Sequence, residues 1–179
     1  MENKTINKKI LFTVLGLIFL VFLGLILVNE YKLNAGEEVI LLTRPVDPRD
    51  YLRGDYVILS YQIETDEKVT NFIKENKLDR GDSLYVVLKK NEENIGEVEK
   101  VLRNKPEDGQ IFIKGTIEED FRTIIDLGIG KYFVPEGRGR EIERLSGNLE
   151  VMVNITSGGE AKIKGIYDKG ELIDFKEKN

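Results

Sequence analysis

The stretch "RGDYVILSYQIE", residues 53–64, places a charged turn directly before an apolar run. Gly54 allows a positive φ, and Asp55 favours a turn because its side chain bonds to nearby backbone. The run from 56 to 64 puts apolar residues on both faces, which predicts a strand covered on both sides over part of its length. The same Arg-Gly-Asp tripeptide recurs before a second apolar run in "RGDSLYVVLKK", residues 80–90. We interpret both copies first as turns that start a strand.

The rest of the chain predicts a mainly β fold. A short helix is expected within 65–82, because apolar residues recur at helical spacing from Val69 to Ile73 and Asp66 can cap them. The stretch 131–147 predicts a strand stub, a Pro-Glu-Gly turn and a short helix. We expect a small antiparallel β-barrel or sandwich-like domain with one or two short helices. The other predicted strands are 38–46, 83–90, 97–104, 109–120, 122–129, 149–156, 160–170 and 171–176.

The most apolar stretch of the chain is "ILFTVLGLIFLVFLGLILV", residues 10–28, which contains no charge. A helix of this length rises about 28 Å, close to the hydrocarbon thickness of a bilayer, about 30 Å. The positive-inside rule places the N-terminus in the cytoplasm, since Lys4, Lys8 and Lys9 precede the stretch.

We therefore expect four segments: 1–9 in the cytoplasm, 10–28 as an anchor in the lipid bilayer, 29–37 as a polar link, and 38–179 as a β-rich domain outside. A cleaved signal peptide is the alternative. Its apolar region is normally about 7–15 residues long, shorter than this one, and "LNAGEE" at 33–38 is a poor cleavage site.

Charge and absent residue types exclude several functions. Three of the 27 basic and two of the 32 acidic residues lie in 1–30, which leaves 24 and 30 outside, a net charge of −6. A mildly acidic surface argues against a nucleic-acid partner. The sequence has no Cys and no His, which removes disulfides, Ser-His and Cys-His nucleophiles and the usual zinc sites. We expect no metal and no cofactor.

Two dense charged stretches are the candidate sites. The first is a turn whose five charges are Asp47, Arg49, Asp50, Arg53 and Asp55. The second follows Tyr132 and holds Glu136, Arg138, Arg140 and Glu143. In one interpretation these charges bond one another and hold a turn or a helix start. In the other they present a polar edge to a partner, and Tyr56, Tyr61 and Tyr132 supply the aromatic contacts that interfaces favour.

"GDYVILSY", Gly54 to Tyr61, resembles the pattern Gly-Asp-Tyr-x-x-Leu-x-Tyr that names the GDYXXLXY family of bacterial membrane-anchored proteins. The later "YFVPEGRGREIE" and the order of the parts extend the resemblance over essentially the whole chain. It implies a small accessory protein in the bacterial cytoplasmic membrane, with a multi-spanning membrane protein as partner and no established activity. The positions that it marks are Gly54, Asp55, Tyr56, Leu59, Tyr61, Pro135, Glu136 and Gly137.

A hydrolase or small-ligand-binding domain stays open as the alternative. "GDYVIL" and "KYFVPEGRG" are faintly similar to type I signal peptidases, whose chemistry needs a Ser nucleophile beside a Lys base. None of the four serines stands in a Ser-Met-x-Pro-like context, so we expect no enzyme activity. A hydrolase would instead bring Asp55, Glu136 and Glu143 together in a cleft, with at least one raised pKa.

Overall fold

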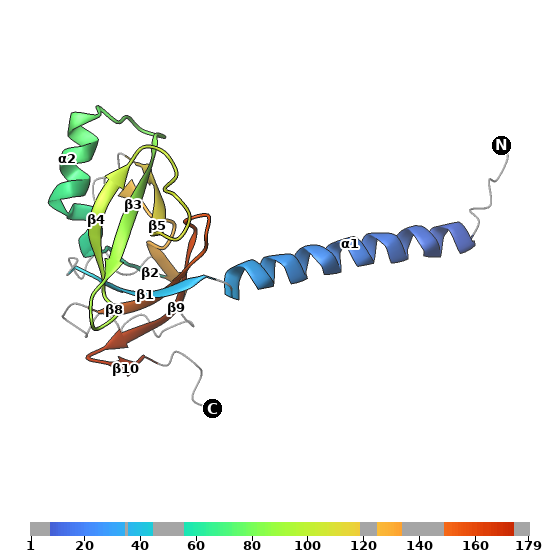
Figure 1. Ribbon diagram of the computed structural model, residues 1–179. Coiled ribbons are helices and arrows are strands. Elements are labelled where there is room, and N and C mark those ends of the chain that lie inside the picture. Colours follow the sequence, from blue (N-terminus) through green and yellow to red (C-terminus); the bar gives the residue numbers. More distant parts are fainter. Residues whose placement is uncertain (1–7, 35, 45–55, 119–124, 134–148, 174–179) are drawn as a thin grey trace. The chain divides into compact units, whose positions relative to one another are not determined.

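The computed structural model describes residues 8–34, 36–44, 56–118, 125–133 and 149–173. The chain divides into two units, Met1–Ala35 and Gly36–Asn179. The described part of the first unit is one long helix, and the second unit holds the described strands and two short helices (Figure 1). The mainly β fold with an apolar N-terminal helix is therefore confirmed.

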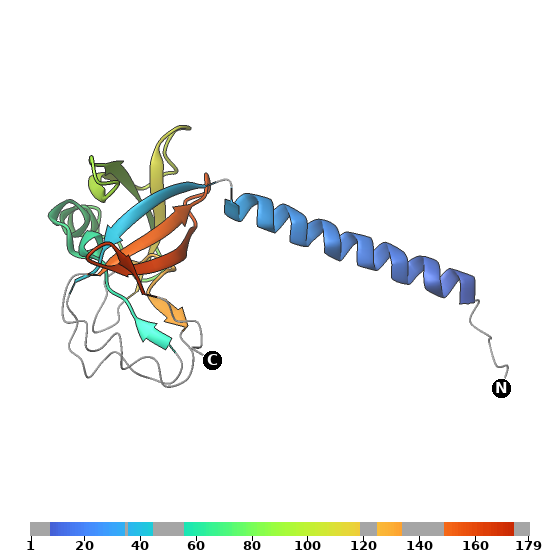
Figure 2. The same cartoon turned by 90° about the horizontal axis from the view of Figure 1, so that it is seen from below.

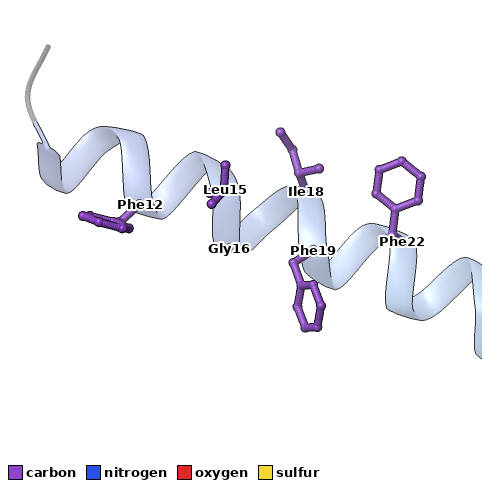
Figure 3. A pocket seen from close by; sticks show the side chains of 6 residues that line it. All are labelled: Phe12, Leu15, Gly16, Ile18, Phe19 and Phe22. Carbon is purple, nitrogen blue, oxygen red and sulfur yellow. The ribbon is translucent and has the colours of Figure 1, made fainter.

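Helix α1 runs over Lys8–Asn34, and its segment Lys8–Val28 is long and apolar enough to cross a membrane. This is compatible with a single-pass anchor. The helix also includes residues 29–34, which the sequence analysis assigned to a polar link. Glu, Lys and Leu in this segment are good helix formers. Gly16 leaves a shallow apolar hollow on the helix surface, with Phe12 and Phe19 on the same side (Figure 3).

One four-stranded antiparallel sheet has the order β1-β8-β9-β10. The strands are β1 (Glu37–Leu42), β8 (Glu150–Ile155), β9 (Ala161–Asp168) and β10 (Glu171–Leu172). The loop "TSGGE", residues 156–160, joins β8 to β9, where Thr156 N donates to Glu160 O at 2.9 Å. The turn "DKG", residues 168–170, joins β9 to β10, with positive φ at both Lys169 and Gly170.

The second four-stranded sheet has the order β4-β3-β5-β6. Its strands are β3 (Ser83–Lys90), β4 (Gly96–Leu102), β5 (Ile111–Ile117) and β6 (Ile125–Asp126). The predicted strands 83–90 and 97–104 are present as β3 and β4, which pair antiparallel. In the second Arg-Gly-Asp copy, Asp82 accepts a hydrogen bond from Asp79 N at 3.1 Å, and Gly81 has φ +92°. That copy is a turn that starts a strand, as expected.

Helix α2 spans Glu67–Glu75 and lies against β4 (Figure 1). Asp66 caps it, because its side chain accepts a hydrogen bond from Lys68 N at 2.8 Å. The short helix predicted within 65–82 is confirmed, and Lys77 adopts a positive φ of 48° just beyond its end. Residues Gln62–Thr65 form a separate 3-10 turn, η2.

The predicted strand 56–64 is wrong beyond its third residue. Strand β2 covers only Tyr56–Ile58 and pairs antiparallel with β7, Lys131–Phe133. Figure 2 shows this two-stranded ribbon, β2 in teal and β7 in orange, at one edge of the domain. Leu59, Ser60 and Tyr61 then enter the core one after another, which agrees with the expectation of cover on both sides.

The two larger sheets share one hydrophobic core and form a sandwich-like domain. Val39, Val151 and Val153 contribute from one sheet, and Leu84 and Ile113 from the other. No closed barrel is formed by the described strands, because only short contacts join the sheets at their margins. One is the parallel bridge of Ile40 with Ile95, and another is the hydrogen bond from Lys114 N to Gly159 O at 2.9 Å.

Gly159 is required where the β8–β9 loop meets β5. Its φ is +84°, and a Cβ there would lie 2.6 Å from the buried Phe112 ring. We expect Gly159→Ala to lower the free energy of unfolding by about 2–4 kcal/mol, because left-handed backbone strain and overpacking add together. The measurement is denaturant unfolding of the full-length chain in detergent.

The matched control is Gly170→Ala. Gly170 also has a positive φ, +81°, but open space surrounds the position of its missing Cβ. Only the backbone strain of about 1–2 kcal/mol should appear there. Equal losses for the two variants would contradict a packing role for Gly159.

Candidate functional site

The structure describes four of the proposed site residues. Tyr56 lies in β2, Leu59 and Tyr61 lie in the core, and Tyr132 lies in β7, half-buried against the core. The remaining candidates lie outside the described residues, so neither the proposed charged edges nor a cleft of carboxylates is tested. These are Asp47, Arg49, Asp50, Arg53, Gly54, Asp55, Pro135, Glu136, Gly137, Arg138, Arg140 and Glu143.

The β2–β7 ribbon brings two distant stretches of the sequence together. Its register pairs Tyr56 with Phe133, Val57 with Tyr132 and Ile58 with Lys131. The ladder continues one step inward, where Leu59 N donates to Gly130 O at 2.9 Å. The "GDYVILSY" and "KYFVPEG" stretches therefore meet through their described residues, which sequence separation alone did not reveal.

Next to the inner end of the ribbon, four segments of the chain come together in a buried region that we call the motif junction. Its residues come from the end of β1, from the segment after β2, from the approach to β7 and from the start of β8. Arg44 N donates to Ser60 O at 2.9 Å, and Gln62 Nε2 donates to Thr43 O at 3.3 Å. The motif junction comprises Thr43, Arg44, Leu59–Glu64, Ile129, Gly130 and Leu149.

Thr43 fastens the motif junction to β8. Its backbone N donates to Leu149 O at 2.8 Å, and Leu149 N donates in return to Thr43 Oγ1 at 2.8 Å. Thr43 Oγ1 also donates to Leu149 O at 3.2 Å. Thr43 is buried, so these bonds satisfy its polar atoms and fix where β1 ends.

Tyr61, the last position of the family-like pattern, is a core residue. Its side chain is 0% exposed, and its hydroxyl donates to Ile129 O at 2.9 Å. Burial raises the pKa of its phenol well above the usual range, and the nearby Glu64 carboxylate adds to the effect. The expectation that Tyr61 offers an aromatic contact to a partner is therefore wrong. A polar tip on a large apolar ring suits a position that joins two core segments.

Glu64 is the functional candidate that the sequence analysis missed. It lies in the η2 turn, is only 4% exposed, and has no described partner for its Oε2 atom. Burial raises the pKa of its carboxyl to about 7, and Asp126 also raises it, while a backbone hydrogen bond from Tyr61 and the charge of Arg44 lower it. The signal was present, because one carboxylate followed directly on an apolar run that was expected to be covered on both sides.

The ribbon also presents an exposed apolar residue. Tyr132 packs against the core, so its neighbours Lys131 and Phe133 face away from it. Phe133 is 76% exposed, more than any other large apolar residue described outside α1. The sequence analysis named Tyr132 as a contact residue and passed over Phe133.

Comparison with known proteins identifies the chain as a member of one family. The model of the GDYXXLXY protein family matches residues 18–166, and the chain therefore belongs to this family. No curated protein and no solved structure matched the chain. Residues Leu59 and Tyr61, two fixed positions of the pattern, have a structural role in the core.

Tyr61→Phe tests that role. Removing the hydroxyl leaves Ile129 O without its buried donor, so we expect a loss of about 1–3 kcal/mol in the free energy of unfolding. Tyr167→Phe is the control, because the Tyr167 hydroxyl makes only a 4.0 Å contact with Met152 Sδ. That variant should change stability by no more than about 0.5 kcal/mol. Denaturant unfolding of both variants compares them directly, and an unchanged Tyr61→Phe protein would rule out the proposed role.

Proposed function

We propose that this protein is a single-pass, membrane-anchored accessory module. Helix α1 anchors it in the bacterial cytoplasmic membrane, and its β domain binds a multi-spanning membrane protein outside the cytoplasm through the β2–β7 ribbon. The function is binding, with no catalysis of its own. The observation that carries the proposal is the exposed Phe133 on the ribbon that joins the two stretches typical of the family.

The anchor is supported by the length and composition of α1. Its membrane-spanning candidate segment, Lys8–Val28, is fully exposed within the described structure, unlike the core helix of a soluble domain. Three lysines precede the apolar stretch and favour an N-terminus inside. The net charge of −6 on the remaining chain suits a protein partner better than nucleic acid or anionic lipid.

The ribbon suits an interface for physical reasons. Phe133 is an exposed aromatic side chain on the same face of β7 as the charged Lys131, and aromatic residues are enriched among interface hot spots. Pairing of β7 with β2, together with the bond from Leu59 N to Gly130 O, holds the Phe133 backbone in place before binding. A prepositioned anchor loses little conformational entropy when a partner binds.

Phe133→Ser tests the interface. The C-terminally tagged, full-length protein is recovered from membranes in mild detergent, and co-purifying proteins are quantified by mass spectrometry. We expect the wild type to retain a near-stoichiometric multi-spanning protein. The variant should lose about tenfold or more in affinity, because a hot-spot aromatic contributes about 2 kcal/mol or more.

Leu172→Ser is the matched control. Leu172 is 57% exposed on β10, which belongs to the sheet of β1, β8 and β9 and not to the ribbon. It should retain the partner as the wild type does. Equal recovery with Phe133→Ser, or loss with both variants, would contradict an interface centred on Phe133. Thermal unfolding of each variant shows that the β domain is intact.

Membrane topology can be tested with introduced cysteines, because the sequence has none. A Ser157→Cys protein places a thiol in the exposed β8–β9 loop. We expect a membrane-impermeant maleimide to label it in intact cells with the outer envelope opened. A Glu2→Cys protein should react only after the cytoplasmic membrane is permeabilised. The reverse pattern would place the β domain inside.

A further inference from the structure

The buried carboxyl of Glu64 lies where three segments of the chain meet. The η2 turn that carries it follows directly on Tyr61, and Glu64 N donates to Tyr61 O at 3.1 Å. Gln62 of the same turn reaches Thr43 O at the end of β1. Tyr61 reaches Ile129 O on the approach to β7. Glu64 thus belongs to a turn that is bonded to the end of β1 and, through Tyr61, to the approach to β7.

The charged groups that face Glu64 come from separate elements. Arg44 follows β1 and Asp126 belongs to β6, while the phenol of Tyr61 lies beside it. Glu64 Oε2 is buried without a described hydrogen-bond partner. A buried charge with incomplete hydrogen bonding is costly, and such a carboxyl relieves the cost by taking up a proton.

We propose that Glu64 is a proton-sensitive latch for the motif junction. In its neutral form the carboxyl is accommodated in the core, and the η2 turn stays packed against the end of β1. When the carboxyl ionises, the cost of burying its charge favours opening of the turn toward water. Opening then loosens the bond from Tyr61 to Ile129 and, with it, the inner end of the β2–β7 ribbon.

The direction of the pH effect follows from the raised pKa of Glu64, about 7 against an ordinary 4.5. The folded state holds the proton more tightly than the unfolded chain does. The stabilisation is therefore fully present below about pH 4.5, falls as pH rises, and is lost once pH has passed through about 7. The latch is closed in mild acid and loosened in mild alkali.

Hydrogen exchange of the full-length chain in nanodiscs tests the latch. Peptides covering 58–66 are followed by mass spectrometry from pH 5 to pH 8.5, with the intrinsic pH dependence of exchange removed. We expect protection to fall about tenfold or more in a step that is under way at pH 5 and levels off above about pH 7. Glu64→Gln keeps the shape of the side chain but cannot ionise, so the step should vanish.

Three other variants make the test specific. Asp126→Asn removes a charge that raises the pKa of Glu64, so the step should move to lower pH. Arg44→Gln removes a charge that lowers it, so the step should move to higher pH. Glu99→Gln, at an exposed position on β4, should leave the step unchanged.

A step that survives in Glu64→Gln, or a wild type without any step, overturns the latch. The readout needs no partner, so it stands apart from the Phe133 experiment. The interface can fail while the latch holds, and the reverse is equally distinguishable.

Discussion

The bond from the Tyr61 hydroxyl to Ile129 O is the interaction on which the candidate site depends. It lies in the core and joins the chain just after β2 to the chain just before β7. A ribbon of three residue pairs has little stability of its own. Its position is set by this bond, by the bond from Leu59 N to Gly130 O, and by the burial of Leu59. The site therefore owes its geometry to the core beneath it.

Local signals predicted most of the elements, and non-local contacts account for the errors. Strand 83–90 and the Asp66 cap follow from patterns within a few residues, and both are present as expected. The prediction of a strand over 56–64 was wrong beyond Ile58, because a run that is apolar on all sides fits a buried strand and other buried backbone conformations equally well. Leu59 and Tyr61 are enclosed by Gly130, Ile129 and the end of β1, which lie far away in sequence. The chain can thus leave strand geometry after Ile58 without exposing apolar surface.

The site was less predictable than the fold for the same reason. The charged stretches were recognised from composition and lie outside the described residues, whereas the ribbon beside them depends on a pairing between positions more than seventy residues apart. The sequence analysis expected Tyr61 to contact a partner and did not name Phe133, but Tyr61 is buried and Phe133 is exposed. An aromatic ring serves a core or an interface equally well. Only the direction of Tyr132 toward the core decided which face of β7 remains outside.

The family pattern in this structure divides into two parts with different physical demands. Its second half, Leu59 to Tyr61, is buried and packed, whereas Tyr56 belongs to the ribbon at the edge of the domain. The six residues from Tyr56 to Tyr61 therefore connect the ribbon to the centre of the core. A rigid connection of this kind would make the ribbon a fixed platform, but Glu64 places an incompletely bonded carboxyl directly behind it. Ionisation of Glu64 at higher pH lowers the stability of the motif junction, whereas an apolar residue at this position would leave that stability independent of pH. A carboxyl that weakens the junction between core and ribbon is easier to understand as a control on the ribbon than as a component of packing.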